Sequence, residues 1–209
     1  MIEAEPAALL AIYADESCLG NGREGENPGG AGAVIEYRHP ASQPVIRRDL
    51  WLCEKATTNN RMALRSVIET LRAVNAKGAR FRVVFTTDSR YIVDGMTRWV
   101  HDWSRRGWRR KGGEIENLAL WREAIRSAAD NAVDWRWVRG HAGHAQNEYA
   151  NHLATRAAAE QSESAGLVPS EFDAWLAASR AKGARHADPI GFPDAREFRE
   201  HSPLPALDG

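Results

Sequence analysis

The chain has 209 residues, of which 43% are hydrophobic and 27% charged, so it is long enough for one folded domain and an appendage. Its two cysteines are too few for a disulfide scaffold, and no apolar run approaches the roughly 20 residues that span a bilayer. The N-terminus also lacks the basic-then-apolar order of a secretory signal, so we expect a cytoplasmic protein.

The formal net charge is zero because two parts of opposite sign cancel. Residues 158–209 hold nine acids and five Lys or Arg, a balance of −4, which leaves +4 for the rest of the chain. A mildly basic body is compatible with a nucleic-acid partner, although the total charge alone argues against one. We expect a domain over residues 1–161 and a C-terminal extension over 162–209, partly helical near Phe172 and flexible at its Pro- and charge-rich end.

The hydrophobic pattern predicts an α/β domain. Strands are expected over 8–14, 33–37, 45–53, 81–86 and 133–138, and helices over about 57–77, 116–129 and 147–159, with another helix beginning near 88. The glycine-rich run 20–32 is predicted to be a loop. Three antiparallel strands followed by strand–helix alternation give a five-stranded mixed sheet, with the last two strands parallel and helices on both faces.

Two aspartates follow apolar strands directly. Asp15 ends the first expected strand, and Asp88 follows the fourth. Because parallel neighbouring strands end at the same edge of a sheet, we expect these two carboxylates to lie side by side. An acid at the end of a buried strand is costly to desolvate and usually has a partner or a metal ion.

Five strings then follow one another in an informative order. They are ADESCLGN at 14–21, TTNNRMALRSVIETL at 57–71, TTDSRYIVDG at 86–95, a Trp- and Arg-rich segment at 99–111, and VRGHAGHAQNEYANHLA at 138–154. Together they resemble a type 1 ribonuclease H over about 12–159. The resemblance implies cleavage of the RNA strand of an RNA–DNA hybrid, giving a 3′-hydroxyl and a 5′-phosphate, by four carboxylates that hold two divalent ions, usually Mg²⁺.

Two of the family's four carboxylates have a match in this sequence, and two do not. Asp15 matches the first and Asp88 the third, whereas the second position is Ala63 and the fourth is Asn151. A glutamate, Glu16, stands where the family has glycine. Strand alternation would point it away from Asp15, but a strand that leaves the pleat there would let it swing back. The expected metal site is therefore Asp15, Glu16, Asp88 and Asn151.

A site with fewer carboxylates binds a hard cation less tightly, so we expect weak Mg²⁺ affinity and better activity with Mn²⁺. His141 matches the mobile loop histidine that the family uses to help activate water or release product, and its glycine neighbours would let it swing. Glu148 is a weaker candidate for the missing ligand. His144 is expected to be loop surface.

The resemblance also implies a nucleic-acid interface. Asn59 and Asn60 match residues that contact the hybrid in the minor groove, where amides can read 2′-hydroxyls; capping of the helix is the structural alternative for one of them. Segment 99–111 resembles the family's basic protrusion, while Trp103 and Trp121 are expected to be mostly structural. The other expected substrate contacts are Cys18, Asn21, Arg90, Trp99, Arg105, Arg106, Arg109 and Arg110.

The predicted function is a ribonuclease H, monomeric and acting away from membranes, with an altered site that takes Mg²⁺ or Mn²⁺, two ions when substrate is bound. The alternative is a catalytically inactive protein that binds RNA–DNA hybrids, which Ala63 and Asn151 favour. A polynucleotidyl transferase on the same fold is disfavoured, because the protrusion and the histidine loop indicate hybrid cleavage.

Overall fold

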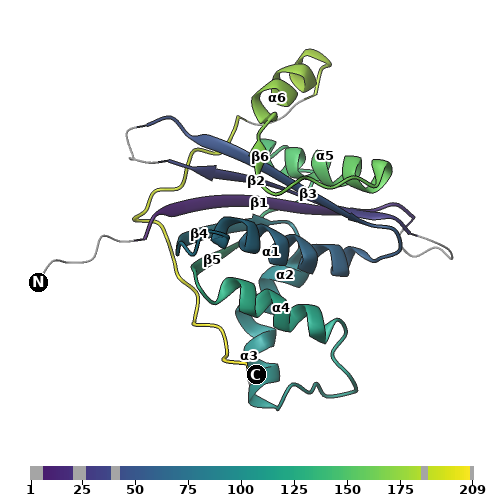
Figure 1. Ribbon diagram of the computed structural model, residues 1–209, viewed down its shortest axis with the longest axis vertical. Helices are drawn as coiled ribbons and strands as arrows, with labels where there is room; N and C mark the ends of the chain where they lie inside the picture. Colours follow the sequence, from purple (N-terminus) through teal and green to yellow (C-terminus); the bar gives the residue numbers. More distant parts are fainter. Residues whose placement is uncertain (1–6, 21–26, 39–42, 185–187, 208–209) are drawn as a thin grey trace, which may run out of the picture.

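The computed structural model describes residues 7–20, 27–38, 43–184 and 188–207. Figure 1 shows a twisted sheet with helices on both faces. The elements are β1 (Leu9–Cys18), β2 (Gly29–Tyr37), β3 (Ile46–Glu54), α1 (Asn59–Asn75), β4 (Arg82–Thr87), α2 (Arg90–Asp94), the π-helical turn η1 (Gly95–Trp99), α3 (Val100–Arg105), α4 (Leu118–Ala128), β5 (Ala132–Trp137), α5 (Ala145–Glu160), β6 (Val168–Pro169) and α6 (Phe172–Ala181).

The strands form one mixed sheet in the order β5-β4-β1-β2-β3-β6. β1, β2 and β3 are antiparallel neighbours, and β4 and β5 add on parallel to β1. The predicted α/β fold with a mixed sheet is confirmed. The sixth strand is the two-residue β6, which comes from the C-terminal extension and pairs with β3.

The sheet separates two hydrophobic cores. One lies under α1 and α4 and includes Ile12 and Ala14 of β1; the other lies under α5 and includes Ala11 and Tyr13. Successive residues of β1 therefore alternate between the α1 side and the α5 side, as a pleated strand requires. No helix in the described ranges is both long and apolar enough to cross a membrane.

The predicted loop over 20–32 is wrong at its end, because β2 begins at Gly29. A Cβ atom at Gly30 would lie 2.1 Å from the carbonyl oxygen of Ala154, and one at Gly32 would lie 2.4 Å from that of Ala150. Helix α5 thus rests directly on the backbone of β2. These glycines serve close packing between helix and sheet and not a turn.

The predicted end of the first strand is also wrong, because β1 continues through Asp15 and Glu16 to Cys18. Its partner on one side, β4, ends at Thr87, which pairs with Ala14, while β2 accompanies β1 all the way to Cys18. From Asp15 onward, β1 therefore has a neighbouring strand on the β2 side alone.

The C-terminal extension contains the helix α6. Its Pro- and charge-rich end, expected to be flexible, instead lies against the domain in residues 188–207. In Figure 1 this segment, drawn in yellow, runs past β4 and β5 and ends near α3. The backbone N–H of His201 donates to the carbonyl of Val133 at 3.3 Å, and the N–H of Trp135 donates to His201 Nδ1 at 3.2 Å. The segment thus covers the outer edge of β5.

Candidate active site

Three carboxylates gather where β1 passes the end of β4. One oxygen from each of Asp15, Glu16 and Asp88 lies within 4.8 Å of the other two. Asp88 follows β4 directly, as the parallel pairing of β4 with β1 predicts. Asp15 has the same parity along the strand as Tyr13, which faces α5, and Glu16 has the parity of Ala14, which faces α1.

The strand does not leave the pleat at this point, so the expected reason for the approach of Glu16 is wrong. The missing neighbour beyond Ala14 supplies another reason. With no strand beside β1 on the β4 side, side chains from both faces can turn around the open edge toward Asp88. Glu16 thereby approaches from the α1 side, the side from which a glutamate at position 63 would reach.

Hydrogen bonds hold Asp15 in place. Its Oδ1 accepts the backbone N–H of Glu16 at 2.7 Å, and its Oδ2 accepts the Nδ2 of Asn147 at 2.9 Å. Asp15 is 5% exposed and Asn147 3%. The Asn147 Oδ1 is buried and has no partner in the described structure, which leaves an acceptor beside the carboxylates. Glu16 accepts a hydrogen bond from Ser89.

Burial and like charge make the cluster resist ionisation. Burial, with Asp88 as the next cause, raises the pKa of Asp15 to about 8, and burial with Asp15 holds the pKa of Glu16 well above its usual range. Burial also raises the pKa of Asp88, which the nearby His141 opposes. Three carboxylates this close together, with the unpartnered amide oxygen of Asn147, suit a divalent cation, because its positive charge would offset the repulsion between the carboxylates.

The loop after β5 packs tightly on Asp88. A Cβ atom at Gly140 would lie 2.1 Å from Asp88 Oδ2, so this position has no room for a side chain. The indole N–H of Trp137 donates to the backbone oxygen of Asp88 at 3.0 Å, and the Arg90 guanidinium stacks 4.0 Å from the Trp137 ring. Arg90 thus lies next to the carboxylate cluster, with its side chain exposed.

His141 stands at the mouth of this loop. Its side chain is 76% exposed, its φ of 51° lies in the left-handed region, and its Nδ1 is 3.8 Å from Glu148 Oε2 in the first turn of α5. His144 is the N-cap residue of α5, and its carbonyl accepts the N–H of Glu148 at 2.9 Å. An exposed imidazole held between Glu148 and Asp88 has the position and the freedom to exchange protons.

The two positions that depart from the type 1 pattern differ in their surroundings. Ala63 is 2% exposed and packs in the core on the α1 side, where it offers no ligand atom. Asn151 is half-buried and lies one helical turn after Asn147, on the same face of α5. Its amide oxygen keeps the chemistry of a neutral metal ligand.

The candidate substrate residues at the start of α1 are not used for capping. Thr58 is the N-cap and accepts the N–H of Arg61 at 3.3 Å, so Asn59 and Asn60 keep their amides for other contacts. The Oδ1 of Asn59 is buried without a partner in the described structure. The Cys18 thiol lies nearby, 3.5 Å from the carbonyl oxygen of Thr57. Asn21 lies outside the described residues.

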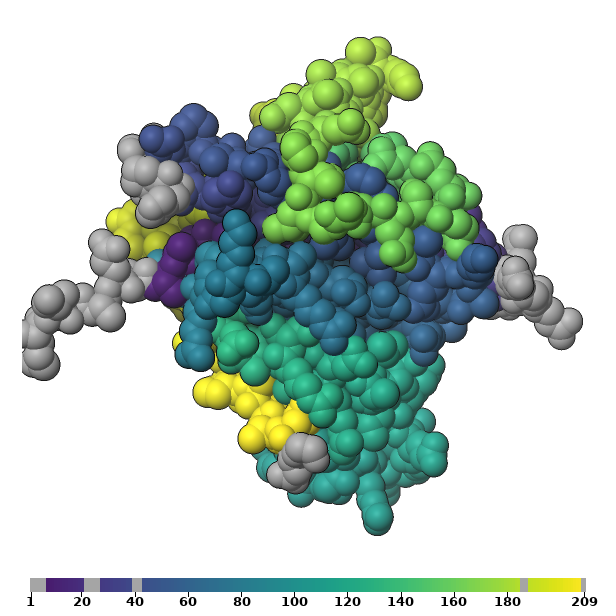
Figure 2. All heavy atoms as spheres, viewed as in Figure 1, coloured from purple at the N-terminus to yellow at the C-terminus, as the bar shows by residue number. Residues whose placement is uncertain are grey.

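The protrusion combines a rigid base with exposed cations. Trp99 and Trp103 pack with Tyr91 and Trp121, and the indole N–H of Trp121 donates to the Tyr91 hydroxyl at 3.0 Å. Gly95 makes room for this cluster, because a Cβ there would meet Trp121 at 1.9 Å. Trp99 is therefore at least partly structural. Beyond the cluster the arginines are exposed: Arg105, which is paired with Asp102, and Arg106, Arg109 and Arg110. Figure 2 shows the protrusion and α6 at opposite ends of the molecule.

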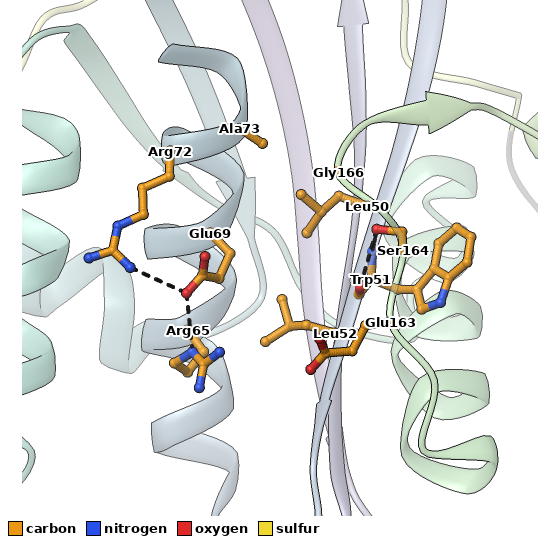
Figure 3. Close-up of a pocket in the computed structure, with 10 residues that line it drawn as sticks. All are labelled: Leu50, Trp51, Leu52, Arg65, Glu69, Arg72, Ala73, Glu163, Ser164 and Gly166. Atoms are coloured by element: carbon orange, nitrogen blue, oxygen red, sulfur yellow. Dashed lines mark hydrogen bonds and ion pairs between the residues drawn. The ribbon is translucent and has the colours of Figure 1, made fainter. Parts of the chain in front are cut away.

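A separate hollow of 360 Å³ lies between α1 and β3 (Figure 3). Three of its charged groups pair with one another: Glu69 lies 3.5 Å from Arg65 and 3.4 Å from Arg72. The carboxylate cluster contributes nothing to its lining. We therefore assign it no part in the chemistry.

Sequence reasoning missed several residues that shape the site. Asn147 positions Asp15, Ser89 donates to Glu16, and Gly140 and Trp137 support Asp88. All four lie inside or beside the strings that carry the resemblance. Nothing in their spacing indicates these contacts, because each contact joins segments far apart in the chain.

The fold and the acidic cluster define a ribonuclease H-like protein, and the comparisons agree. The chain belongs to the ribonuclease H family, whose model RNase H matches residues 7–159. Ribonuclease H of Vibrio vulnificus strain YJ016 is 38% identical over 78% of this chain and 97% of that protein. Ribonuclease H of Pelobacter propionicus is 41% identical over 75% of this chain and 91% of that protein.

Two solved structures extend the comparison. LC9-RNase H1, described as a type 1 RNase H with the type 2 active-site motif, is 63% identical and superposes with a TM-score of 0.88, covering 97% of this chain and 96% of that one. The PFV RNase H domain is 18% identical, with a TM-score of 0.60 over 74% of this chain and 96% of that one, and so shares the fold. The resemblance inferred from the sequence is confirmed at the level of the family.

Proposed function

We propose that the protein hydrolyses the RNA strand of RNA–DNA hybrids in a divalent-metal-dependent reaction that leaves 5′-phosphates. The observation that carries the proposal is the approach of Asp15, Glu16 and Asp88 to within 4.8 Å of one another, in a chain of the ribonuclease H family. Relatives named ribonuclease H at 38% and 41% identity support the reaction.

The carboxylates of Asp15, Glu16 and Asp88 would hold the metal, and Asn151 would add an amide oxygen. Mg²⁺ or Mn²⁺, as two ions with substrate bound, would activate a water molecule and stabilise the leaving oxygen of the phosphodiester. With one carboxylate fewer than the type 1 pattern, this site would saturate at higher Mg²⁺ and work better with Mn²⁺.

Glu16 takes over the role of the glutamate that α1 lacks. Ala63 leaves a vacancy on the α1 side, and Glu16 has the strand parity of that side. The description of LC9-RNase H1 as a type 1 enzyme with another class's active-site motif supports a relocated acidic set, since that protein is 63% identical to this one.

Each remaining residue then has a physical task. Asn147 orients Asp15 by its hydrogen bond, and Gly140 leaves space for the Asp88 carboxylate. His141 accepts or delivers a proton at the solvent edge, steadied by Glu148. Amide groups of Asn59 and Asn60 read 2′-hydroxyls, and Cys18 lies beside them.

The exposed cations complete the interface with the hybrid. Arg90 and the protrusion arginines contact phosphates, and Trp99 offers the edge of the aromatic cluster to the DNA strand. We propose that the protein acts as a monomer, since one chain holds every part of this set.

The test is cleavage of an end-labelled hybrid in Mg²⁺ and in Mn²⁺. Glu16→Gln keeps the shape of the side chain and removes its charge, so we expect a loss of about 100-fold or more in kcat with hybrid affinity retained. Glu69→Gln is the matched control, because it neutralises a glutamate of α1 that pairs with arginines. Asp88→Asn sets the background. A Glu16→Gln protein as active as its parent would contradict the proposal.

A transfer of the carboxylate gives a second test. Glu16→Gly restores the residue that the family has after the first aspartate, and Ala63→Glu restores the helix glutamate. We expect Glu16→Gly to be inactive and the double variant to recover part of the parent's kcat. No recovery in a double variant that folds and binds hybrid would mean that the two positions are not equivalent.

The second candidate function is a catalytically inactive protein that binds RNA–DNA hybrids, and the buried Ala63 is the observation that favours it. Such a protein would bind hybrid more tightly than duplex DNA and would cleave nothing in either metal. The parent and Asp88→Asn would then show the same background signal in the cleavage assay.

A further inference from the structure

The C-terminal extension touches the active-site helix α5 at more than one place. Phe172 and Trp175 of α6 pack on Tyr149, and Ile190 meets the start of the helix. The amide of Gln146, in the first turn of α5, forms two reciprocal hydrogen bonds with the backbone of Ile190. Its Nε2 donates to the Ile190 carbonyl at 2.7 Å, and its Oε1 accepts the Ile190 N–H at 3.0 Å. Gln146 is fully buried. A side-chain amide that pairs in this way behaves like a short piece of neighbouring strand.

This contact is one residue from the site. Asn147, next to Gln146, donates to Asp15 and holds its carboxylate. The N-cap of α5, His144, makes no side-chain capping bond, so the first turn of the helix lacks the usual device that fixes a helix start. The position of Asn147 therefore depends on the contacts that its neighbours make, and the pair with Ile190 is the one that the extension supplies at the adjacent residue, Gln146.

The segment that carries Ile190 is itself anchored at several places. The Arg199 N–H donates to Asp134 Oδ2 at 3.1 Å, and His201 exchanges hydrogen bonds with Val133 and Trp135 at the edge of β5. Farther along, Leu204 and Leu207 pack against the core on the α1 side. The segment thus joins the start of α5 to the edge of β5, and in Figure 1 it ends near α3.

None of the extension's residues lies in the part of the chain that the family model matches, which ends at 159. We propose that the C-terminal extension is a working part of the active site: by pairing with Gln146 it fixes the first turn of α5, sets Asn147 against Asp15, and so raises the affinity of the carboxylates for divalent ions. Gln146 and Ile190 are positioning residues that act through Asn147.

The proposal deepens the proposed function and rests on it for its catalytic part. Outer partners of metal-binding groups typically change metal affinity or activity by about 10- to 100-fold, and the Gln146 pair acts one residue further out. We therefore expect a change of about 3- to 10-fold in both quantities.

Ile190→Pro is the sharpest variant, because it removes the N–H that Gln146 accepts and leaves the carbonyl in place. Ala195→Pro is the matched control. Ala195 is exposed, lies in the same segment, and follows Asp194, whose carbonyl accepts the Glu197 N–H at 2.9 Å in a turn whose second position suits proline. Gln146→Leu removes both bonds from the other side, together with the hydrogen bond that Gln146 makes to Glu36.

The measurements separate positioning from general stability. The full-length variants are titrated with Mn²⁺ while tryptophan fluorescence and the thermal midpoint are followed, unfolded with urea in EDTA, and assayed for kcat and KM on the hybrid. We expect Ile190→Pro and Gln146→Leu to raise the Mn²⁺ midpoint and to lower kcat with KM unchanged. Ala195→Pro should match the parent.

Two results would overturn the inference. One is that Ile190→Pro and Gln146→Leu, as single variants, each lower the free energy of unfolding but keep the parent's Mn²⁺ midpoint and kcat. The contact would then be purely structural. The other is an equal effect of Ala195→Pro. If the parent binds Mn²⁺ but cleaves no hybrid, the proposed function fails, and the Mn²⁺ midpoints still decide whether the extension positions the site.

Discussion

Replacing Asp15 by asparagine should make the metal-free protein more stable at high pH. In the folded protein, burial and the neighbouring carboxylates raise the pKa of Asp15 from 3.8 to about 8. The folded protein therefore binds more protons than the unfolded chain between these two values, and stability is lost as the pH rises through that window. An asparagine at this position carries no charge and escapes this loss.

The size of the effect follows from the shift. Full ionisation of a group whose pKa has moved by about four units costs roughly 5 kcal/mol, of which about 3–4 kcal/mol falls between about pH 5 and about pH 8. The asparagine amide can accept one of the two hydrogen bonds from Glu16 N–H and Asn147 but not both, which costs roughly 1 kcal/mol at every pH. The pH dependence, and not the stability at one pH, is thus the diagnostic quantity.

The assay is urea unfolding of parent and Asp15→Asn in EDTA at these two pH values. We expect the free energy of unfolding of the variant, relative to that of the parent, to rise by roughly 3 kcal/mol from the lower to the higher pH. Mn²⁺ should then stabilise the parent at the higher pH and have little effect on the variant. A difference between the two proteins that does not change with pH would refute the reasoning, because Asp15 would then be ionised as easily in the folded protein as in the unfolded chain.

Three further predictions follow from close packing and charge. Gly140→Ala should displace the Asp88 carboxylate and lower kcat by about 10-fold or more, whereas Gly191→Ala, whose Cβ would meet nothing within 4 Å, should leave cleavage unchanged; equal rates would contradict the close approach. Gly32→Ala should cost about 2 kcal/mol or more in urea unfolding, because its Cβ would push α5 off β2, and a smaller cost would show that the helix yields. Neutralising the four exposed arginines of the protrusion should lower hybrid affinity and flatten its salt dependence by about 0.9 for each phosphate that the protein no longer neutralises, and an unchanged slope would remove the protrusion from the interface. The four are Arg105, Arg106, Arg109 and Arg110.

The sequence predicts the framework of the site well because the framework depends on local patterns. The strand–helix alternation of the sequence predicts that β4 lies parallel to β1, and this pairing alone brings Asp15 and Asp88 together. The hydrophobic pattern likewise predicted a helix over about 57–77, where the structure has α1 at Asn59–Asn75. In each case a short-range periodicity decides the arrangement.

What the sequence could not predict depends on contacts between distant segments. Gly30 and Gly32 look like loop residues until α5 is placed on them. The acids after Ala14 break the apolar pattern, so the pattern predicts that β1 ends there, although β2 continues beside it. The end of the C-terminal extension has no hydrophobic periodicity to predict its position. It is held by hydrogen bonds of its backbone, such as those of Ile190.

The open flank of β1 beyond Ala14 also bears on how such a site changes over evolutionary time. On the proposed function, a glutamate on the strand and one on α1 would approach the same metal position from a single side of the sheet. A lineage could gain Glu16 first and lose the helix glutamate later, so that the site would hold a glutamate at every step. Moving a ligand from one element to another would then take two point substitutions and no rearrangement of the backbone.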